Sequence, residues 1–137
     1  MKHLGYQLSI KGCLLFFIIF SALSSSAQHD SAHSKTHVYI GTASYYAQKF
    51  VGRRTAGGEL FNQKKMTAAC NILPLGTWVK VTNLQNNKTV IVKINDRLHV
   101  RNKRLIDLTI AAADVLDFLQ KGIVKVKIEQ IERKSKS

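Results

Sequence analysis

Residues 76–97 read GTWVKVTNLQNNKTVIVKINDR and predict the central element of the fold, a β-hairpin. Apolar side chains recur at every second position on both sides of a polar stretch, a spacing typical of strands with one buried face. These apolar positions are Val79, Val81, Val90, Val92 and Ile94. The polar stretch QNNK at 85–88 supplies Asn, which tolerates the left-handed backbone of tight turns. The second strand therefore ends by presenting Asp96 beside Arg97.

Three further strands and one helix are predicted around this hairpin. The strands are 37–46 (HVYIGTASYY), 105–108 (LIDL) and 123–132 (IVKVKIEQIE). Thr109 suits the N-cap of a helix over 110–120, and Gly122 suits its end. Many short strands with one helix indicate a mainly β fold, either a compact barrel or a sandwich with a small helical insert.

The first 27 residues have the features of a cleaved secretory signal. Lys2 and Lys11 supply positive charge, 13–20 (CLLFFIIF) is apolar throughout, and small residues precede a cut after Ala27. The alternative is an uncleaved membrane anchor, although a spanning helix needs about 20 apolar residues. Cys13 precedes the hydrophobic stretch instead of following it, so a lipid anchor is not expected. We predict export to the periplasm or the cell envelope.

The remainder of the chain is read as a single domain with short flanks. Residues 28–37 (QHDSAHSKTH) lack periodicity and are predicted to be a flexible leader, 38–131 form the folded domain, and 132–137 are a basic tail. The three histidines of the leader, four residues apart, would form one metal-binding face on a helix. Nothing else favours a helix there, so no metal or other cofactor is expected.

The chain is strongly basic. It has 21 Lys and Arg against 8 Asp and Glu, a net charge of +13, and removing the signal with its two lysines leaves 19 − 8 = +11. Such an excess indicates a polyanionic partner, either nucleic acid or the acidic polymers of a cell envelope, or else a solvated surface without a specific partner. Export and the lack of an aromatic-basic binding motif argue against nucleic acid. Cleavage also leaves Cys70 as the sole cysteine, which excludes an intrachain disulfide.

Three acids lie in predicted loops or at predicted strand ends. They are Glu59 in TAGGELF, Asp96 in INDR and Asp107 in LIDL. Acids at strand ends can converge on a barrel mouth, where two carboxyl groups across a cleft suit cleavage of a glycosidic bond. The alternative is that each acid holds a loop by accepting backbone N–H bonds. Because neighbours on a strand point to opposite faces, Asp96 is free for chemistry while Arg97 serves the scaffold or a substrate carboxylate.

Six ordered motifs between residues 41 and 128 resemble one family. They are GTASYY, GRRTAGGE, MTAA, LPLGTWVKVTNL, VKINDR and IDLTIAAA. In this order and spacing they are similar to the rare lipoprotein A (RlpA) family of septal-ring proteins. The resemblance implies a six-stranded double-psi β-barrel and lytic transglycosylase activity on peptidoglycan, with preference for glycan strands stripped of stem peptides.

The resemblance also implies roles for individual residues. The family's catalytic Asp corresponds to Asp96 and its important Glu to Glu59. Asp96 would protonate the glycosidic oxygen and then take the proton of the C6 hydroxyl of the same muramic acid, closing a 1,6-anhydro ring without water. Five further residues are expected to bind substrate: Tyr46, Thr55, Cys70, Arg97 and Asp107.

The sequence departs from the family pattern at the proposed cleft. Cys70 stands where the family usually has His, Asn62 stands where it usually has Asp, and 98–100 (LHV) replaces the usual GPF. The alternative function is therefore a non-catalytic, expansin-like module that binds glycan and loosens the wall. A protease-inhibitor barrel is a third interpretation, although such barrels are usually rich in disulfides. Expected partners are peptidoglycan strands and division-septum proteins, and the expected state is a monomer.

Overall fold

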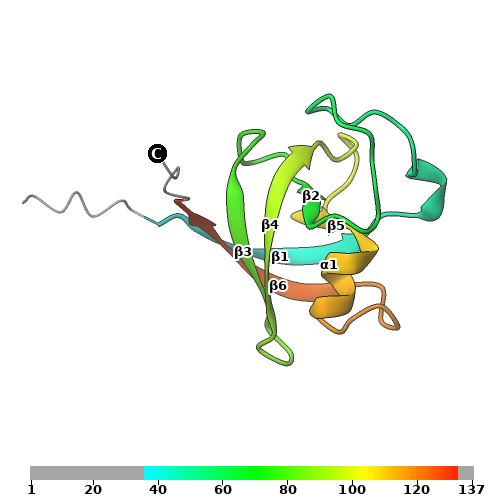
Figure 1. Ribbon diagram of the computed structural model, residues 1–137. Coiled ribbons are helices and arrows are strands. Elements are labelled where there is room, and N and C mark those ends of the chain that lie inside the picture. The colour runs from blue at the N-terminus through cyan, green and yellow to red at the C-terminus, as the bar shows by residue number, and fades with distance from the viewer. Residues whose placement is uncertain (1–35, 133–137) are drawn as a thin grey trace, which may run out of the picture. The chain divides into compact units, whose positions relative to one another are not determined.

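The computed structural model describes residues 36–132, which form a closed barrel of six strands (Figure 1). The strands are β1 (Val38–Tyr45), β2 (Thr67–Ala69), β3 (Trp78–Asn83), β4 (Thr89–Asp96), β5 (Ile106–Leu108) and β6 (Val124–Ile131). Their order around the barrel is β1-β5-β2-β4-β3-β6, in which β1–β5 and β2–β4 are parallel and the other four pairs are antiparallel. The predicted mainly β fold with one short helix is confirmed.

Several predictions for the ends of the chain lie outside the described residues. These are the signal over 1–27, most of the leader over 28–37 and most of the basic tail over 132–137. Within residues 36–132, no helix is both long and apolar enough to cross a membrane.

The predicted hairpin forms as β3 and β4. Val79 pairs with Val92 and Val81 with Val90, and all four side chains are buried. Asn87 in the connecting turn has a φ of 60°, the left-handed conformation that Asn tolerates. The alternation of buried and exposed positions follows directly from this pairing, because successive side chains of a strand point to opposite faces.

The barrel interior holds one apolar core. It consists mainly of valines and isoleucines from the strands, and Leu116 and Phe118 fill it from beyond the helix. Each such side chain, when fully buried, contributes about 1.5–3 kcal/mol to folding. The core fixes the strand ends, because shifting one strand by a residue would turn its apolar face to solvent.

The helix α1 (Ile110–Val115) is shorter than predicted. Its start is confirmed, since the Thr109 hydroxyl accepts a bond from the Ala112 N–H. The end predicted near residue 120 is wrong. Asp117 takes a left-handed backbone with φ 56°, and the Phe118 N–H donates to the Ala113 carbonyl, which is the pattern of a Schellman stop. The early stop turns Phe118 into the core, and Gly122 ends only the following turn.

The strand β2 was not predicted. Its three residues, Thr67–Ala69, are two alanines after a threonine, and Ala is a poor strand former. They form a strand because they are buried between two neighbours, β4 on one side and β5 on the other. Tertiary pairing overrides local propensity here.

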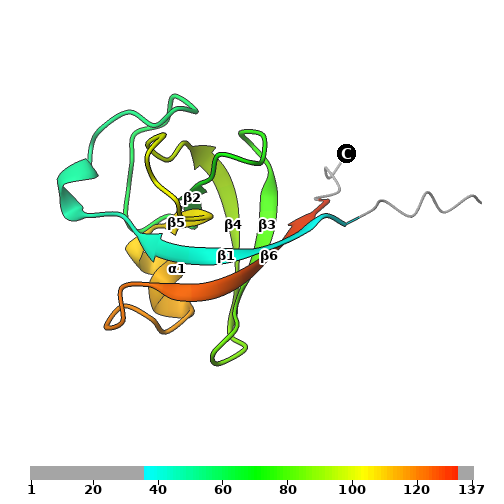
Figure 2. The ribbon, with the colours of Figure 1, turned by 180° about the vertical axis from the view of Figure 1, so that it is seen from behind.

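The connection between β1 and β2 lies at the end of the barrel where β4 finishes, opposite the tip of the β3–β4 hairpin (Figures 1 and 2). It includes a short 3₁₀ helix, η1 (Gln48–Phe50). Two predicted motifs, GTASYY and TAGGE, therefore meet the end of β4 in space.

We predict that Asn83→Ala lowers the free energy of unfolding by about 1–3 kcal/mol, because a buried amide loses its partners. Asn83 is 1% exposed, donates to the Leu116 carbonyl at 2.9 Å and accepts from the Gln85 N–H at 2.9 Å. Urea unfolding measures the change. Asn86→Ala is the control, since Asn86 donates to the same carbonyl from an exposed position. Equal losses in the two variants would contradict this account.

Candidate active site

A β-bulge between β2 and β4 decides where Asp96 points. Ala68 pairs with Ile94, but Ala69 pairs with Asp96, so Asn95 is an extra residue on β4. Ile94 faces the barrel core and is fully buried. In a regular strand Asp96, two residues later, would face the core as well. The extra residue reverses this, and Asp96 shares the face of Ala69 instead.

Asp96 and Asp107 line one cavity of about 620 Å³. Ala69 lies between them in the sheet, paired with Asp96 on β4 and with Asp107 on β5. The rest of the lining comes from the end of β1, from η1 and from the segment that follows β4. Its other side chains include Tyr46, Lys49, Phe50, Arg97, His99, Asn102 and Arg104. The expectation that acids at strand ends converge is met by Asp96 and Asp107.

Three donors hold the Asp96 carboxylate. Oδ1 accepts from the Ala56 N–H at 2.9 Å and from the Arg97 N–H at 2.8 Å, and Oδ2 accepts from the Tyr46 hydroxyl at 2.8 Å. Burial of the Tyr46 ring, and then its bond to Asp96, raise the pKa of the phenol far above its ordinary value. Tyr46 therefore remains a neutral donor.

The TAGGE motif delivers one of these donors. The Gly57 N–H donates to the Asn95 carbonyl at 2.9 Å, and a Cβ on Gly57 would lie 2.8 Å from that same oxygen. Only glycine permits so close an approach of two backbones. Gly58 then turns the chain with φ +89°, and the Thr55 N–H closes the loop onto the Glu59 carbonyl at 2.7 Å. This closure places the Ala56 N–H against Asp96.

Glu59 reaches the neighbourhood of Asp96 but not the cavity lining. Its carboxylate accepts from Lys93 Nζ and from Asn95 Nδ2, each at 3.3 Å. The bond from Asn95, and next the bond from Lys93, lower the pKa of Glu59 below its ordinary value. Its side chain therefore bonds to the residue next to Asp96 on β4.

The Arg97 side chain has the first of its two predicted roles, that of holding the scaffold. Its guanidinium donates to the backbone carbonyls of Cys70 and Leu73. Among residues 36–132 no ion pair joins Asp96 to a basic side chain. Arg97 also lines the cavity, so its position remains compatible with a substrate carboxylate.

Cys70 and Thr55, both predicted to bind substrate, are buried. The Cys70 N–H donates to the Asp96 carbonyl at 3.1 Å, so this residue holds the backbone of the site, and its side chain is part of the core cluster. The Thr55 hydroxyl finds no hydrogen-bond partner within the described part of the chain. Neither residue lines the cavity.

Asp107 is paired inside the cavity wall. Arg104 donates to its two carboxylate oxygens at 2.7 and 2.9 Å, and Asn102 lies 3.4 Å from one of them. The same pairing raises the pKa of Arg104. A two-point ion pair of this kind holds Asp107 in a fixed, charge-balanced position. Within the described residues, Asp96 is therefore the cavity acid without a cationic partner.

Sequence reasoning did not identify Phe50 and Lys49. Phe50 lines the cavity from η1, with Lys49 Nζ 5.4 Å and the Arg53 guanidinium 5.6 Å from the centre of its ring. The sequence feature that could have indicated Phe50 is its place as an aromatic residue in a polar loop, at the end of YYAQKF and just before GRRTAGGE.

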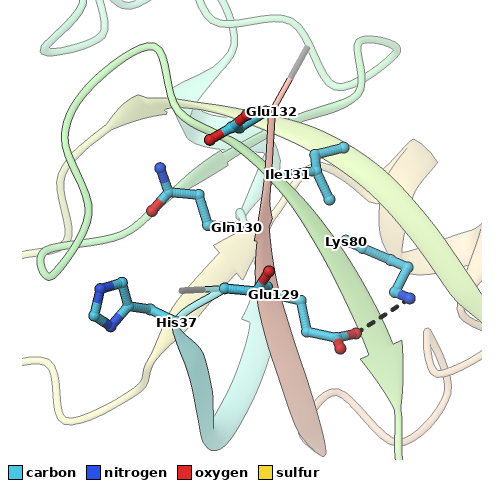
Figure 3. A pocket seen from close by; sticks show the side chains of 7 residues that line it. His37, Lys80, Glu129, Gln130, Ile131 and Glu132 are labelled. Atoms are coloured by element: carbon cyan, nitrogen blue, oxygen red, sulfur yellow. Dashed lines mark ion pairs between the residues drawn. The ribbon is translucent and has the colours of Figure 1, made fainter. Parts of the chain in front are cut away.

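A second cavity lies beside His37 and Glu129 (Figure 3). Glu129 is paired there with Lys80 at 3.2 Å and with Lys127 at 3.4 Å, and these bonds, that from Lys80 first, lower its pKa. None of the three predicted acids lines this cavity. Within residues 36–132, no three His, Cys, Asp or Glu side chains gather as a metal site.

Comparison with known proteins identifies the class to which this fold and cavity belong. A family model described as "Lytic transglycolase" matches residues 38–128. The chain belongs to this family, and its barrel is the double-psi β-barrel of the RlpA proteins.

The curated relatives carry the name endolytic peptidoglycan transglycosylase RlpA. The Haemophilus influenzae protein is 48% identical over 98 residues, which are 72% of this chain and 34% of that one. The Pseudomonas aeruginosa PAO1 protein is 46% identical over 99 residues, 72% of this chain and 29% of that one. This chain thus spans about a third of the length of these relatives.

Solved structures share the fold at lower identity. A Streptomyces papain inhibitor superposes with a TM-score of 0.57 at 22% identity, over 70% of this chain and 96% of that one. A Clavibacter michiganensis expansin mutant in complex with cellohexaose superposes with a TM-score of 0.58 at 17% identity, over 74% of this chain and 54% of that one. At such identities these likenesses establish only the barrel.

We predict that Asn95→Ala raises the pKa of Glu59 toward its ordinary value, because the Asn95 bond is the largest cause of the lowering. Carboxyl-detected NMR titration measures it. Lys93→Gln should also raise the pKa of Glu59, because Lys93 lowers it through a hydrogen bond and through its charge. Lys80→Gln, which removes a partner of Glu129 instead, should leave the pKa of Glu59 unchanged. If the pKa of Glu59 is the same in Asn95→Ala as in the wild type, the Glu59 side chain does not contact Asn95 and the account is contradicted.

Proposed function

We propose that this protein is an exported lytic transglycosylase that cleaves the glycan strands of peptidoglycan in the cell envelope. Membership of the lytic transglycolase family and the names of the RlpA relatives support the reaction class. The observation that carries the proposal is the position of Asp96. It faces a cavity, is held by three hydrogen bonds and has no cationic partner in the described part of the chain.

The chemistry requires one acid used twice. Protonated Asp96 gives its proton to the glycosidic oxygen while the bond from that oxygen to C1 of muramic acid breaks. The ionised Asp96 then takes the proton of the C6 hydroxyl as the C6 oxygen bonds to C1. The products are a free hydroxyl on one sugar and a 1,6-anhydro ring on the other, and no water is consumed. Glu59 supports the site by accepting a hydrogen bond from the side chain of Asn95, which precedes Asp96 on β4.

The cations around the cavity favour strands without stem peptides. Muramic acid carries a lactyl carboxylate that is free only when no peptide is attached. Lys49 and Arg97 line the cavity beside Asp96, and Arg104 is already paired with Asp107. Phe50, flanked by Lys49 and Arg53, offers an aromatic face of the kind that sugars pack against. Binding carried by such exposed charges weakens with salt.

A non-catalytic glycan-binding module is the second candidate. Cys70 stands at the position where the family usually has His, and its side chain is buried instead of lining the cavity. Division-septum proteins as partners and a monomeric state remain predictions from the family resemblance.

We predict that Asp96→Asn lowers the release of 1,6-anhydromuramic products from denuded glycan strands by about 10²–10⁴-fold while strand binding persists. Mass spectrometry of the products and a pull-down with the same strands give the two readouts. Asp114→Asn is the matched control, because Asp114 is exposed on α1 outside this cavity. Binding without any product from the unmutated protein would favour the module. Equal product from wild type and Asp96→Asn would remove Asp96 from the reaction.

A further inference from the structure

We propose that Tyr46 is a positioning residue that confines proton transfer by Asp96 to a single lone pair on Oδ2. This inference rests on the proposed transglycosylase function and names the atom at which its proton moves. It follows from the hydrogen bonds around the carboxylate and from how firmly Tyr46 is held.

The Asp96 carboxylate has one acceptor site that is not occupied by a hydrogen bond from the described residues. A carboxylate offers about four lone-pair sites, two on each oxygen. On Asp96, Oδ1 already accepts from two backbone N–H groups, those of Ala56 and Arg97. Among residues 36–132, the Tyr46 hydroxyl is the only group that donates to Oδ2. The free site therefore lies on Oδ2, beside the phenol.

The backbone donors on Oδ1 cannot rotate away. The Arg97 N–H belongs to the residue after Asp96, and the Ala56 N–H is fixed by the adjoining Gly57 bond to Asn95. Oδ1 thus remains occupied in either protonation state of the carboxyl group. Without the phenol, Oδ2 would be free to leave its orientation toward the cavity.

Tyr46 is itself fixed at both ends. Its N–H donates to the Leu108 carbonyl at 3.0 Å and its carbonyl accepts from Gln63 Nε2 at 2.9 Å. Its ring packs on Phe61 with centroids 4.3 Å apart and meets Phe50 edge-on at 5.9 Å. Gln63 is in turn anchored, because its Oε1 accepts from the Ile110 N–H at 2.8 Å. The hydroxyl therefore has a defined place relative to Asp96.

The phenol retains its proton throughout the reaction. Burial, and then the bond and charge of Asp96, raise the pKa of Tyr46 far above its ordinary value. The proton given to the glycosidic oxygen therefore leaves from the open site of Oδ2, and the proton of the C6 hydroxyl returns to that same site. Tyr46 donates its hydrogen bond to Oδ2 before, during and after both transfers.

Tyr46→Phe tests this inference, because the ring packing remains and only the hydroxyl is lost. On denuded glycan strands we expect kcat to fall about 10- to 100-fold, the loss that a displaced catalytic group gives, with KM changed less than about twofold. Tyr39→Phe is the control, because it removes a phenol outside the cavity from β1, the strand that ends just before Tyr46. An unchanged kcat would overturn the inference, and so would a raised KM alone, since that result assigns Tyr46 to sugar binding.

A crystal structure of Tyr46→Phe gives a readout that does not depend on turnover. We expect the Asp96 carboxyl group to adopt more than one orientation in the variant and a single orientation in the wild type. A single wild-type orientation retained in the variant would overturn the positioning role. An inactive wild-type protein whose Asp96 still loses its orientation in Tyr46→Phe would reject the proposed function and leave the positioning contact standing.

Discussion

One extra residue in β4 is the constraint on which the site depends. The strand runs through the core as far as Ile94, and a regular continuation would bury the Asp96 side chain among aliphatic groups. The bulge at Asn95, opposite Ala69, turns the carboxylate into a cavity instead. The rigid barrel thus aims a reactive group outward at a point where β2 is bonded on both sides, to β4 and to β5.

The elements around Asp96 come from distant parts of the sequence but serve the same carboxylate. The TAGGE loop brings the Ala56 N–H, the end of β1 brings the Tyr46 hydroxyl, and β4 itself brings the Arg97 N–H. The Arg97 guanidinium instead donates to the backbone carbonyls of Cys70 and Leu73. Asp107 shares the cavity but is tied to Arg104. Asp96 is thus the acid available for the reaction, and Asp107 holds the wall of the cavity in place.

Much of this arrangement could be predicted from local pattern. Alternation of apolar residues located β3 and β4, Asn87 marked the turn, and the INDR motif marked Asp96. Features set by tertiary pairing could not be predicted: the Ala-rich strand β2, the bulge at Asn95, and the Schellman stop at Asp117. The direction of the Glu59 side chain could not be predicted either, because it depends on where the donor groups of Lys93 and Asn95 lie in space. Phe50 was overlooked because no periodicity distinguishes a single aromatic residue in a loop.

The most direct test is a crystal structure of Asp96→Asn soaked with a denuded muramic-acid-containing tetrasaccharide. The account predicts that the sugar lies in the cavity beside Tyr46 and Phe50, with its scissile oxygen within hydrogen-bonding distance of the position 96 side chain. It further predicts that the position 96 atom facing the sugar is the one in contact with the Tyr46 hydroxyl. A saccharide bound beside His37 and Glu129, or seated against Glu59 with position 96 turned away, would contradict it.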